Sequence, residues 1–190
     1  MNDLVIKNLS FSYGRKRILN NLSLTVCPDK PILLSGESGI GKTTLLRLIM
    51  GLERAETGTV SPVGKVSAVF QEDRLLPFKT VWENMLLFCD ENEADEALNA
   101  LGIADTKDKY PSALSGGMAR RVAIARAIAH GGDVFILDEA FSGLDGENSK
   151  KAALFIKEKT KGKILIIVSH NKGDGELLGA QTVDFSSLQA

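Results

Sequence analysis

Two short stretches of the chain combine glycines with hydroxyl side chains, a composition suited to binding phosphate. Residues 36–44 read GESGIGKTT, and residues 114–118 read LSGGM. Bare backbone amides beside a helix N-terminus bind anions, so each stretch can cradle a phosphate group. Only the first carries a lysine, Lys42. The two stretches are therefore predicted to contact phosphate in different ways.

The first stretch fits the pattern G-x-x-x-x-G-K-[ST] between an apolar strand and a helical run, which is the context that its mechanism requires. The amides from Ser38 to Thr43 can surround a β-phosphate, and Lys42 can bridge the β- and γ-phosphates. The Thr43 hydroxyl can ligate Mg²⁺. A glycine-rich turn with only a structural role explains neither the lysine nor the threonine.

An acidic pair ends the apolar run VFILDE at residues 134–139. Asp138, at the end of a buried strand, can hold a magnesium-bound water. Glu139 follows it and can polarise a water that attacks the γ-phosphate. The alternative is an acidic pair that only faces solvent. It is less favoured because the glycine-rich loop and the acidic pair occur in the expected order.

Residues 171–174, NKGD, fit the N-K-x-D pattern by which GTPases read guanine. GTPases also need a D-x-x-G that senses the γ-phosphate, and no Asp of this sequence has Gly three residues later. We therefore interpret NKGD as a coincidence.

The elements that must position these residues alternate between strands and helices. Residues 13–21 are predicted to be a loop, and 58–71 a hairpin with a Pro-Val-Gly turn. The region 83–130 is predicted to be helical, with a break at 109–117. Periodicity predicts helices at 44–52 and 148–161 and strands at 4–11, 22–26, 31–35, 133–141, 163–170 and 182–187. This order predicts a mostly parallel α/β sheet with an attached antiparallel β layer.

Composition is that of one soluble globular domain of 190 residues, with 44% hydrophobic and 25% charged residues. A net charge of −1 gives no electrostatic reason to expect a nucleic-acid partner. Cys27 and Cys89 stand in apolar settings and are predicted to be reduced thiols, not a disulfide or a metal site. The longest apolar runs, such as Ile164–Val168, are too short to span a membrane.

Taken together, the motifs resemble the nucleotide-binding subunit of ABC transporters over nearly the whole chain. Residues 36–44 match Walker A, LSGGM the family signature and VFILDE Walker B. Tyr13 in FSYG matches the aromatic residue that stacks on adenine, and Gln71 in VFQED matches the glutamine that reaches Mg²⁺ and senses the membrane partner. Asp145 in SGLD matches the D-loop, and His170 in IVSH matches the switch histidine.

This resemblance implies a P-loop NTPase fold with a RecA-like core of the ABC type. Residues 1–190 then form a single ABC ATPase domain. An antiparallel β subdomain and the core occupy 1–71 and 131–190, and a helical subdomain with the signature occupies 72–130. The implied function is ATP hydrolysis that powers a prokaryotic transporter, with ATP and Mg²⁺ as ligands.

The resemblance also assigns roles to residues. Glu139, His170 and Gln71 are the expected catalytic residues, and Thr43, Gln71 and Asp138 the expected magnesium ligands. The expected nucleotide contacts are Tyr13, Gly36, Glu37, Ser38, Gly39, Ile40, Gly41, Lys42, Thr43, Thr44, Ser115, Gly116, Gly117 and Asp145.

The implied partners explain why one chain carries two phosphate cradles. In this family two copies pack head to tail, and each ATP lies between Walker A of one copy and the signature of the other. Transmembrane permease subunits would hold the chain at the cytoplasmic face of the cell membrane, an external solute-binding protein would act indirectly, and nucleic acid is not expected. The stretch QEDRLLPFKTVWENM resembles importers of nitrate, sulfonate, taurine and related compounds. LLPF and VWENMLLF are equally compatible with docking a permease helix and with core packing.

The sequence departs from the family pattern at three positions. Met118 replaces the signature glutamine, Ala140 the proline after the catalytic glutamate, and Asn171 the aspartate after the switch histidine. Two other functions are compatible with the motifs: a non-transport ABC-type ATPase and a regulatory nucleotide-binding module. A DNA-repair ATPase of this type needs a long coiled coil between Gln71 and the signature, and that interval is too short. A module that does not hydrolyse ATP would lack Glu139 or His170.

Overall fold

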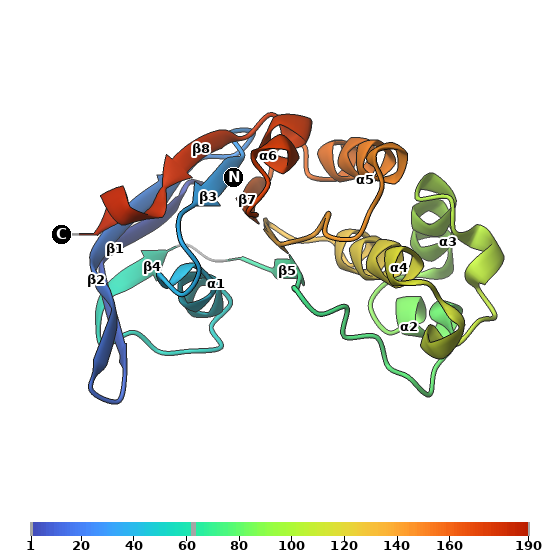
Figure 1. Ribbon diagram of the computed structural model, residues 1–190, viewed down its shortest axis with the longest axis horizontal. Coiled ribbons are helices and arrows are strands. Elements are labelled where there is room, and N and C mark those ends of the chain that lie inside the picture. The colour runs from blue at the N-terminus through green and yellow to red at the C-terminus, as the bar shows by residue number, and fades with distance from the viewer. Residues whose placement is uncertain (1, 62–63, 190) are drawn as a thin grey trace.

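An antiparallel sheet covers one side of the fold. The computed structural model describes residues 2–61 and 64–189, and Figure 1 shows this sheet at the left. Its strand order is β2 (Lys16–Val26), β1 (Leu4–Tyr13), β4 (Thr57–Ser61). The predicted loop at 13–21 is wrong, because β2 begins at Lys16 and pairs with Tyr13 across a two-residue turn. Leu19 and Leu22 of β2 are completely buried. This burial explains why the strand begins closer to the turn than the sequence predicts.

A parallel sheet forms the centre of the fold. Its strand order is β5 (Val66–Val69), β6 (Val134–Asp138), β7 (Ile164–Val168), β3 (Ile32–Ser35), β8 (Gln181–Asp184), and each of these pairings is parallel. The predicted hairpin at 58–71 is wrong, because β4 pairs with β1 and β5 pairs with β6. Its turn residues 62 and 63 lie outside the described residues. β5 alternates buried and half-buried residues and joins the core, whereas β4 is mostly exposed.

The helices surround this sheet on both faces. They are α1 (Lys42–Ile49), α2 (Val81–Leu86), α3 (Glu91–Ala100), α4 (Gly116–Ala129), α5 (Gly146–Lys159) and α6 (Lys172–Leu178), with short 3-10 turns at Ala104–Thr106, Pro111–Ala113 and Phe185–Leu188. Asp90 caps α3 in a capping box with Glu93. Helix α6 was not predicted. Asn171 caps it by accepting the Gly173 N–H at 3.0 Å, so the NKGD stretch begins a helix.

Alternate residues of the parallel strands bury on opposite faces, as a strand covered on both sides requires. One set, which includes Phe135, Leu165 and Ile167, packs against the face with α3, α4 and α5. The other set, which includes Ile136 and Ile166, packs toward α1 and the antiparallel sheet. Figure 1 shows α2, α3 and α4 on the side of the molecule away from β1 and β2. Because the strands run parallel, their carboxyl ends meet at one edge, where an open α/β sheet binds ligands.

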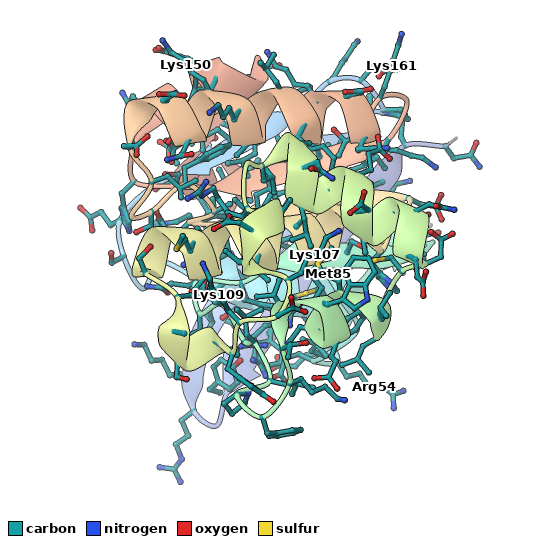
Figure 2. All side chains as sticks on the ribbon, turned by 90° about the vertical axis from the view of Figure 1, so that its right-hand side faces the viewer. Arg54, Met85, Lys107, Lys109, Lys150 and Lys161 are labelled. Atoms are coloured by element: carbon teal, nitrogen blue, oxygen red, sulfur yellow. The ribbon has the colours of Figure 1, made fainter. Side chains whose placement is uncertain are left out.

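The stretch from Leu75 to Phe88 divides between core and surface. Val81 and Met85 are completely buried, whereas Phe78 is 73% exposed and Leu86, Leu87 and Phe88 are exposed as well. Figure 2 looks onto the face formed by α2 to α5, where Met85 lies among the helices and Lys150 and Lys161 project at the two ends of α5. Both cysteines are free thiols, as predicted. Among the described residues, no helix has the length and apolarity needed to cross a bilayer.

Candidate nucleotide-binding and hydrolysis site

A cavity of ≈ 470 Å³ lies at the carboxyl edge of the parallel sheet. Four strands deliver candidate residues to this edge, because β3 ends directly before a predicted motif and β5, β6 and β7 each end within one. Its lining residues are Ile18, Ser38, Gly39, Gly41, Lys42, Thr43, Thr44, Gln71, Asp138, Glu139, Ser142, Val168 and His170. The fold therefore gathers into one cavity side chains that lie far apart in the sequence, such as Ser38 and His170, which are 132 residues apart.

The phosphate-loop stretch connects β3 to the N-terminus of α1, as predicted. Gly41 precedes the helix with φ at 116°, a conformation that L side chains rarely adopt. A Cβ at this position would lie 3.0 Å from Leu19 Cδ2 and 3.1 Å from Ile18 Cγ2. Backbone conformation and close packing on β2 thus both require glycine here.

Lys42 is the first residue of α1 and is only 6% exposed. Its Nζ donates to the carbonyl oxygens of Gly36 at 2.7 Å and of Glu37 at 2.8 Å. These two bonds fix the ammonium group within the loop at the cavity wall. A fixed positive charge beside a helix N-terminus is suited to binding the anionic oxygens of a polyphosphate.

Asp138 ends β6 as a buried carboxylate. Burial raises the pKa of Asp138 above its ordinary value, and the charge of Glu139 raises it further. The positive charges of Lys42 and Arg120 act in the opposite direction on this pKa but do not cancel the rise. A cation placed at the Asp138 carboxylate would offset the cost of burying its charge.

The donor set around Asp138 fits Mg²⁺. Thr43, Gln71 and Asp138 line the same cavity and supply a hydroxyl, an amide and a carboxylate oxygen, the hard ligands that Mg²⁺ prefers. Among the described residues, no group of three or more His, Cys, Asp or Glu side chains could hold a metal alone. One carboxylate is nevertheless sufficient for Mg²⁺ when phosphate oxygens and waters complete its octahedron.

Glu139 adopts a strained conformation directly after β6, with φ at 53°. Such strain costs about 1–3 kcal/mol in a non-glycine residue and persists only where surrounding contacts hold it. The Glu139 N–H donates to Val168 O at 2.8 Å, and its Oε1 accepts the His170 N–H at 3.0 Å. The carboxylate is thereby fixed against the end of β7.

His170 reaches both the phosphate loop and Glu139. Its Nε2 lies 3.4 Å from Ser38 Oγ and 3.7 Å from Glu139 Oε1. The buried Ser169 hydroxyl lies 3.4 Å from Glu139 Oε2 and donates to Asp174 Oδ2 at 2.6 Å. Sequence reasoning missed Ser169 and Asp174, because their contacts appear only when α6 packs beside β7.

The signature stretch lies outside this cavity. Ser115 caps α4 by accepting the Met118 N–H at 3.2 Å, and a Cβ on Gly117 would lie 3.3 Å from Gly143 O. The signature therefore packs against the SGLD stretch. Asp145 of that stretch caps α5, and the Asn148 N–H lowers the pKa of its carboxyl. The described lining of the cavity contains none of Ser115, Gly116, Gly117 and Asp145.

Four further predicted contacts also lie outside the described lining. Tyr13 is 47% exposed at the end of β1, stacks edge-on against Phe11 and donates to Glu53 Oε1 at 3.3 Å. Gly36 and Glu37 face Lys42 with their carbonyl oxygens, and Ile40 packs toward the core.

Three lining residues were not among the predicted contacts: Ile18, Ser142 and Val168. Ser142 begins the SGLD stretch, so that motif was the available signal. Ile18 was missed because residues 13–21 were predicted to be a loop. Val168 was missed because its strand was predicted to be buried, with no part in ligand contact.

The sequence of the chain is similar to those of known proteins. The profile of the family described as "ABC transporter" matches residues 19–142. The chain is 35% identical over 181 residues to the "Aliphatic sulfonates import ATP-binding protein SsuB 2" of Paracoccus denitrificans, covering 92% of this chain and 74% of the relative. It is 36% identical over 179 residues to the "Aliphatic sulfonates import ATP-binding protein SsuB 1" of Streptomyces avermitilis, covering 91% and 69%.

Two solved structures share the fold. One is described as "Structure of ATP binding subunit of ABC transporter", with a TM-score of 0.83 and 22% identity over 92% of this chain and 82% of that chain. The other is a bacterial Atm1-family ABC exporter with ATP bound, with a TM-score of 0.83 and 24% identity over 91% of this chain and 35% of that chain. At these identities the likeness concerns the fold alone.

Proposed function

Since the family profile spans residues 19–142 and the named relatives are 35% and 36% identical, the chain belongs to the ABC transporter ATP-binding family, and we propose that the cavity at the edge of its parallel sheet is the site of ATP hydrolysis. The fold expected from the sequence, a P-loop α/β fold with an antiparallel sheet, is confirmed. The chain is an ATP-binding and ATP-hydrolysing subunit that powers import.

One observation carries the assignment of the site. Lys42, Thr43, Gln71, Glu139 and His170 come from distant parts of the chain and line one cavity, together with the buried carboxylate that ends β6. Polar residues with only a structural role would pair with one another and would not surround an open space. Here a buried ammonium, a hydroxyl and two carboxylates line a cavity of ≈ 470 Å³.

The proposed mechanism gives each residue a task. The loop amides and Lys42 bind the β- and γ-phosphates. Thr43, Gln71 and Asp138 would hold Mg²⁺, which supplies charge neutralisation on the phosphates. Glu139, fixed at the end of β7 by the His170 N–H, orients the attacking water and accepts its proton. The His170 ring, beside Ser38, is placed to hydrogen-bond the γ-phosphate.

The position of the signature supports a head-to-tail dimer. Ser115 caps the N-terminus of α4 and lies outside the described lining of the Lys42 cavity. We therefore propose that Ser115, Gly116 and Gly117 contact the γ-phosphate bound by a second copy of the chain, with Tyr13 stacking on adenine and Asp145 at the same interface. ATP then joins the two copies, and hydrolysis releases them. The division into a helical subdomain at 72–130 and a core formed by 1–71 and 131–190 remains a prediction.

A second cavity offers a place for the permease. It measures ≈ 440 Å³ and is lined largely by apolar residues, among them Met50, Leu52, Phe70, Leu76 and Phe88. We call it the apolar groove. Exposed apolar surface of this kind marks an interaction site. We propose that a cytoplasmic helix of a permease subunit docks here, which would hold the chain at the cytoplasmic face of the membrane as a peripheral subunit.

The named relatives suggest the transported solute. Both are described as aliphatic sulfonates import proteins. We propose that this chain powers uptake of a small sulfonate, delivered to its permease by an external binding protein. Growth of the source organism on an alkanesulfonate as sole sulfur source, with and without the gene, tests this substrate class independently of the ATPase site.

Substitution of Lys42 tests the site itself. Lys42→Ala should weaken Mg-ATP binding at least tenfold, because the phosphate charge loses its fixed ammonium. Lys161→Ala removes an exposed lysine at the far end of α5 (Figure 2) and is the matched control, with unchanged affinity expected. Isothermal titration calorimetry gives both values. Equal ATP affinity in wild type and Lys42→Ala would refute the assignment of the cavity.

A further inference from the structure

Two arginines of α4 bind the backbone of the segment that contains Gln71. Arg120 Nη1 donates to Phe70 O at 2.7 Å, and its Nη2 donates to Gln71 O. Arg126 Nη2 donates to Asp73 O at 2.9 Å, and its Nη1 donates to Arg74 O at 2.8 Å. Helix α4 thus holds four carbonyl groups of residues 70–74, about 50 residues away in the sequence. We call residues 70–74 the Gln71 segment.

Arg120 is the more deeply placed of the two. Arg120 is only 7% exposed, and its Nε lies 3.2 Å from Asp73 Oδ1. That carboxylate oxygen is buried and accepts no hydrogen bond from the described residues, so its contact with Arg120 is an ion pair. All three contacts of the Arg120 side chain therefore go to the Gln71 segment. A planar guanidinium suits this task, because its donors form a rigid fork that a lysine cannot reproduce.

The Gln71 segment is also strained. Arg74 has φ at 49°, in the left-handed region, and its guanidinium lies 3.9 Å from the centre of the Phe70 ring. Strain in a non-glycine residue persists only where surrounding contacts determine the conformation, and it is concentrated at switch regions and active sites. Here the contacts with Arg126 and Phe70 provide that constraint.

The segment separates two cavities with different proposed occupants. Gln71 lines the Lys42 cavity, whereas Phe70 and Arg74 line the apolar groove. The signature residue Ser115 caps the N-terminus of α4, and Arg126 and His130 at the other end of this helix line the groove. Arg120 therefore joins the backbone of Gln71 to the helix that begins at the signature.

We propose that Arg120 is a positioning residue. Together with Arg126 it joins the Gln71 segment to α4. The Gln71 side chain therefore reaches its place in the hydrolysis site only when α4 is in position. The inference rests on the proposed role of Gln71. It goes beyond that role because it names the residue that sets the position of Gln71.

A double-mutant cycle tests the coupling. ATP turnover is measured for Gln71→Ala, Arg120→Gln and their combination, at saturating Mg-ATP. Arg120→Gln should lower turnover at least tenfold, and adding it to Gln71→Ala should cause no further loss, because the residue acts through Gln71. Arg121→Gln is the matched control. Arg121 stands next on α4 but donates to Leu101 O at 3.0 Å, to Gly102 O at 3.4 Å and to Gly117 O of the signature at 3.3 Å, away from the Gln71 segment. Its effect should multiply with that of Gln71→Ala.

Arg120→Lys separates the hydrogen-bonding fork from the positive charge that Arg120 places near Asp138. The proposal expects Arg120→Lys to be nearly as impaired as Arg120→Gln, and full turnover in Arg120→Lys would overturn it. Multiplicative losses in the cycle would overturn it as well. If Arg120→Gln does not fold by circular dichroism, Arg126→Gln is used in the same cycle, with the same expected outcome.

The proposed function can fail separately. If Lys42→Ala turns over ATP like wild type, the hydrolysis site is wrong. If Lys42→Ala is inactive but Gln71→Ala is fully active, the positioning role of Arg120 is refuted while the hydrolysis site stands.

Discussion

Glu139→Gln tests the proposed general base with little change in structure. Glu139 Oε1 accepts the His170 N–H at 3.0 Å, and an amide oxygen can accept the same bond. The amide nitrogen would face Ser169 Oγ, 3.4 Å from the present Oε2, and could donate to it because the Ser169 proton already goes to Asp174. Both contacts that fix the side chain are therefore retained, and only the charge and the basicity are lost.

This retention sets the expected magnitude. Removal of a positioned general base lowers turnover by roughly 10²–10⁴-fold. At about 1.36 kcal/mol per tenfold change, the loss corresponds to roughly 2.7–5.4 kcal/mol of activation free energy. ATP affinity should stay within about threefold of wild type, because Lys42 and the loop amides are untouched.

The assay combines phosphate release with size-exclusion chromatography. Glu139→Gln should bind Mg-ATP, lose turnover and elute as a dimer that persists in ATP, whereas wild type returns to monomer as ATP is consumed. Glu147→Gln is the matched control, since Glu147 is exposed on α5 and pairs with Lys151. Turnover of Glu139→Gln within threefold of wild type would refute the general-base assignment. A Glu139→Gln chain that stays monomeric in ATP would count against the dimer proposal alone.

Three further predictions concern other parts of the molecule. Ser115→Arg should bind ATP as a monomer but lose hydrolysis. Mixing it with inactive Lys42→Ala should restore activity, because one composite site is then intact. No phosphate release at any mixing ratio would contradict a shared site. The raised pKa of Asp138 means that the folded state binds its proton more tightly than the unfolded state, so this group lowers stability as pH rises through the folded pKa. Asp138→Asn should accordingly raise the melting temperature at pH 7 and lose this advantage near pH 3, and an unchanged or lower melting temperature at pH 7 would contradict the reasoning. Burial raises the pKa of the Cys89 thiol to about 11, so the folded chain should react with iodoacetamide at pH 8 far more slowly at Cys89 than the unfolded chain does, as peptide mass spectrometry can measure.

Much of the candidate site could be predicted from the sequence because its signals are local. The phosphate loop needs Gly41 for its backbone conformation and Lys42 at the start of the helix, and both requirements appear within nine consecutive residues. Asp138 and Glu139 follow an apolar run whose burial on both faces is evident from composition. Because parallel strands end at a common edge, the order of motifs along the chain was sufficient to predict that they meet.

Tertiary structure alone decided which strands pair and which helices hold the site. The hairpin pattern at 58–71 does not reveal that β4 pairs with β1 and β5 with β6. That division depends on burial in the whole fold, where β5 joins the core and β4 stays mostly exposed. The link from Arg120 to the Gln71 segment and the contact of Ser169 with Asp174 likewise arise only when α4 and α6 pack in place. Local conformation follows from neighbouring residues, whereas a contact between distant segments depends on which surfaces the whole chain must bury together.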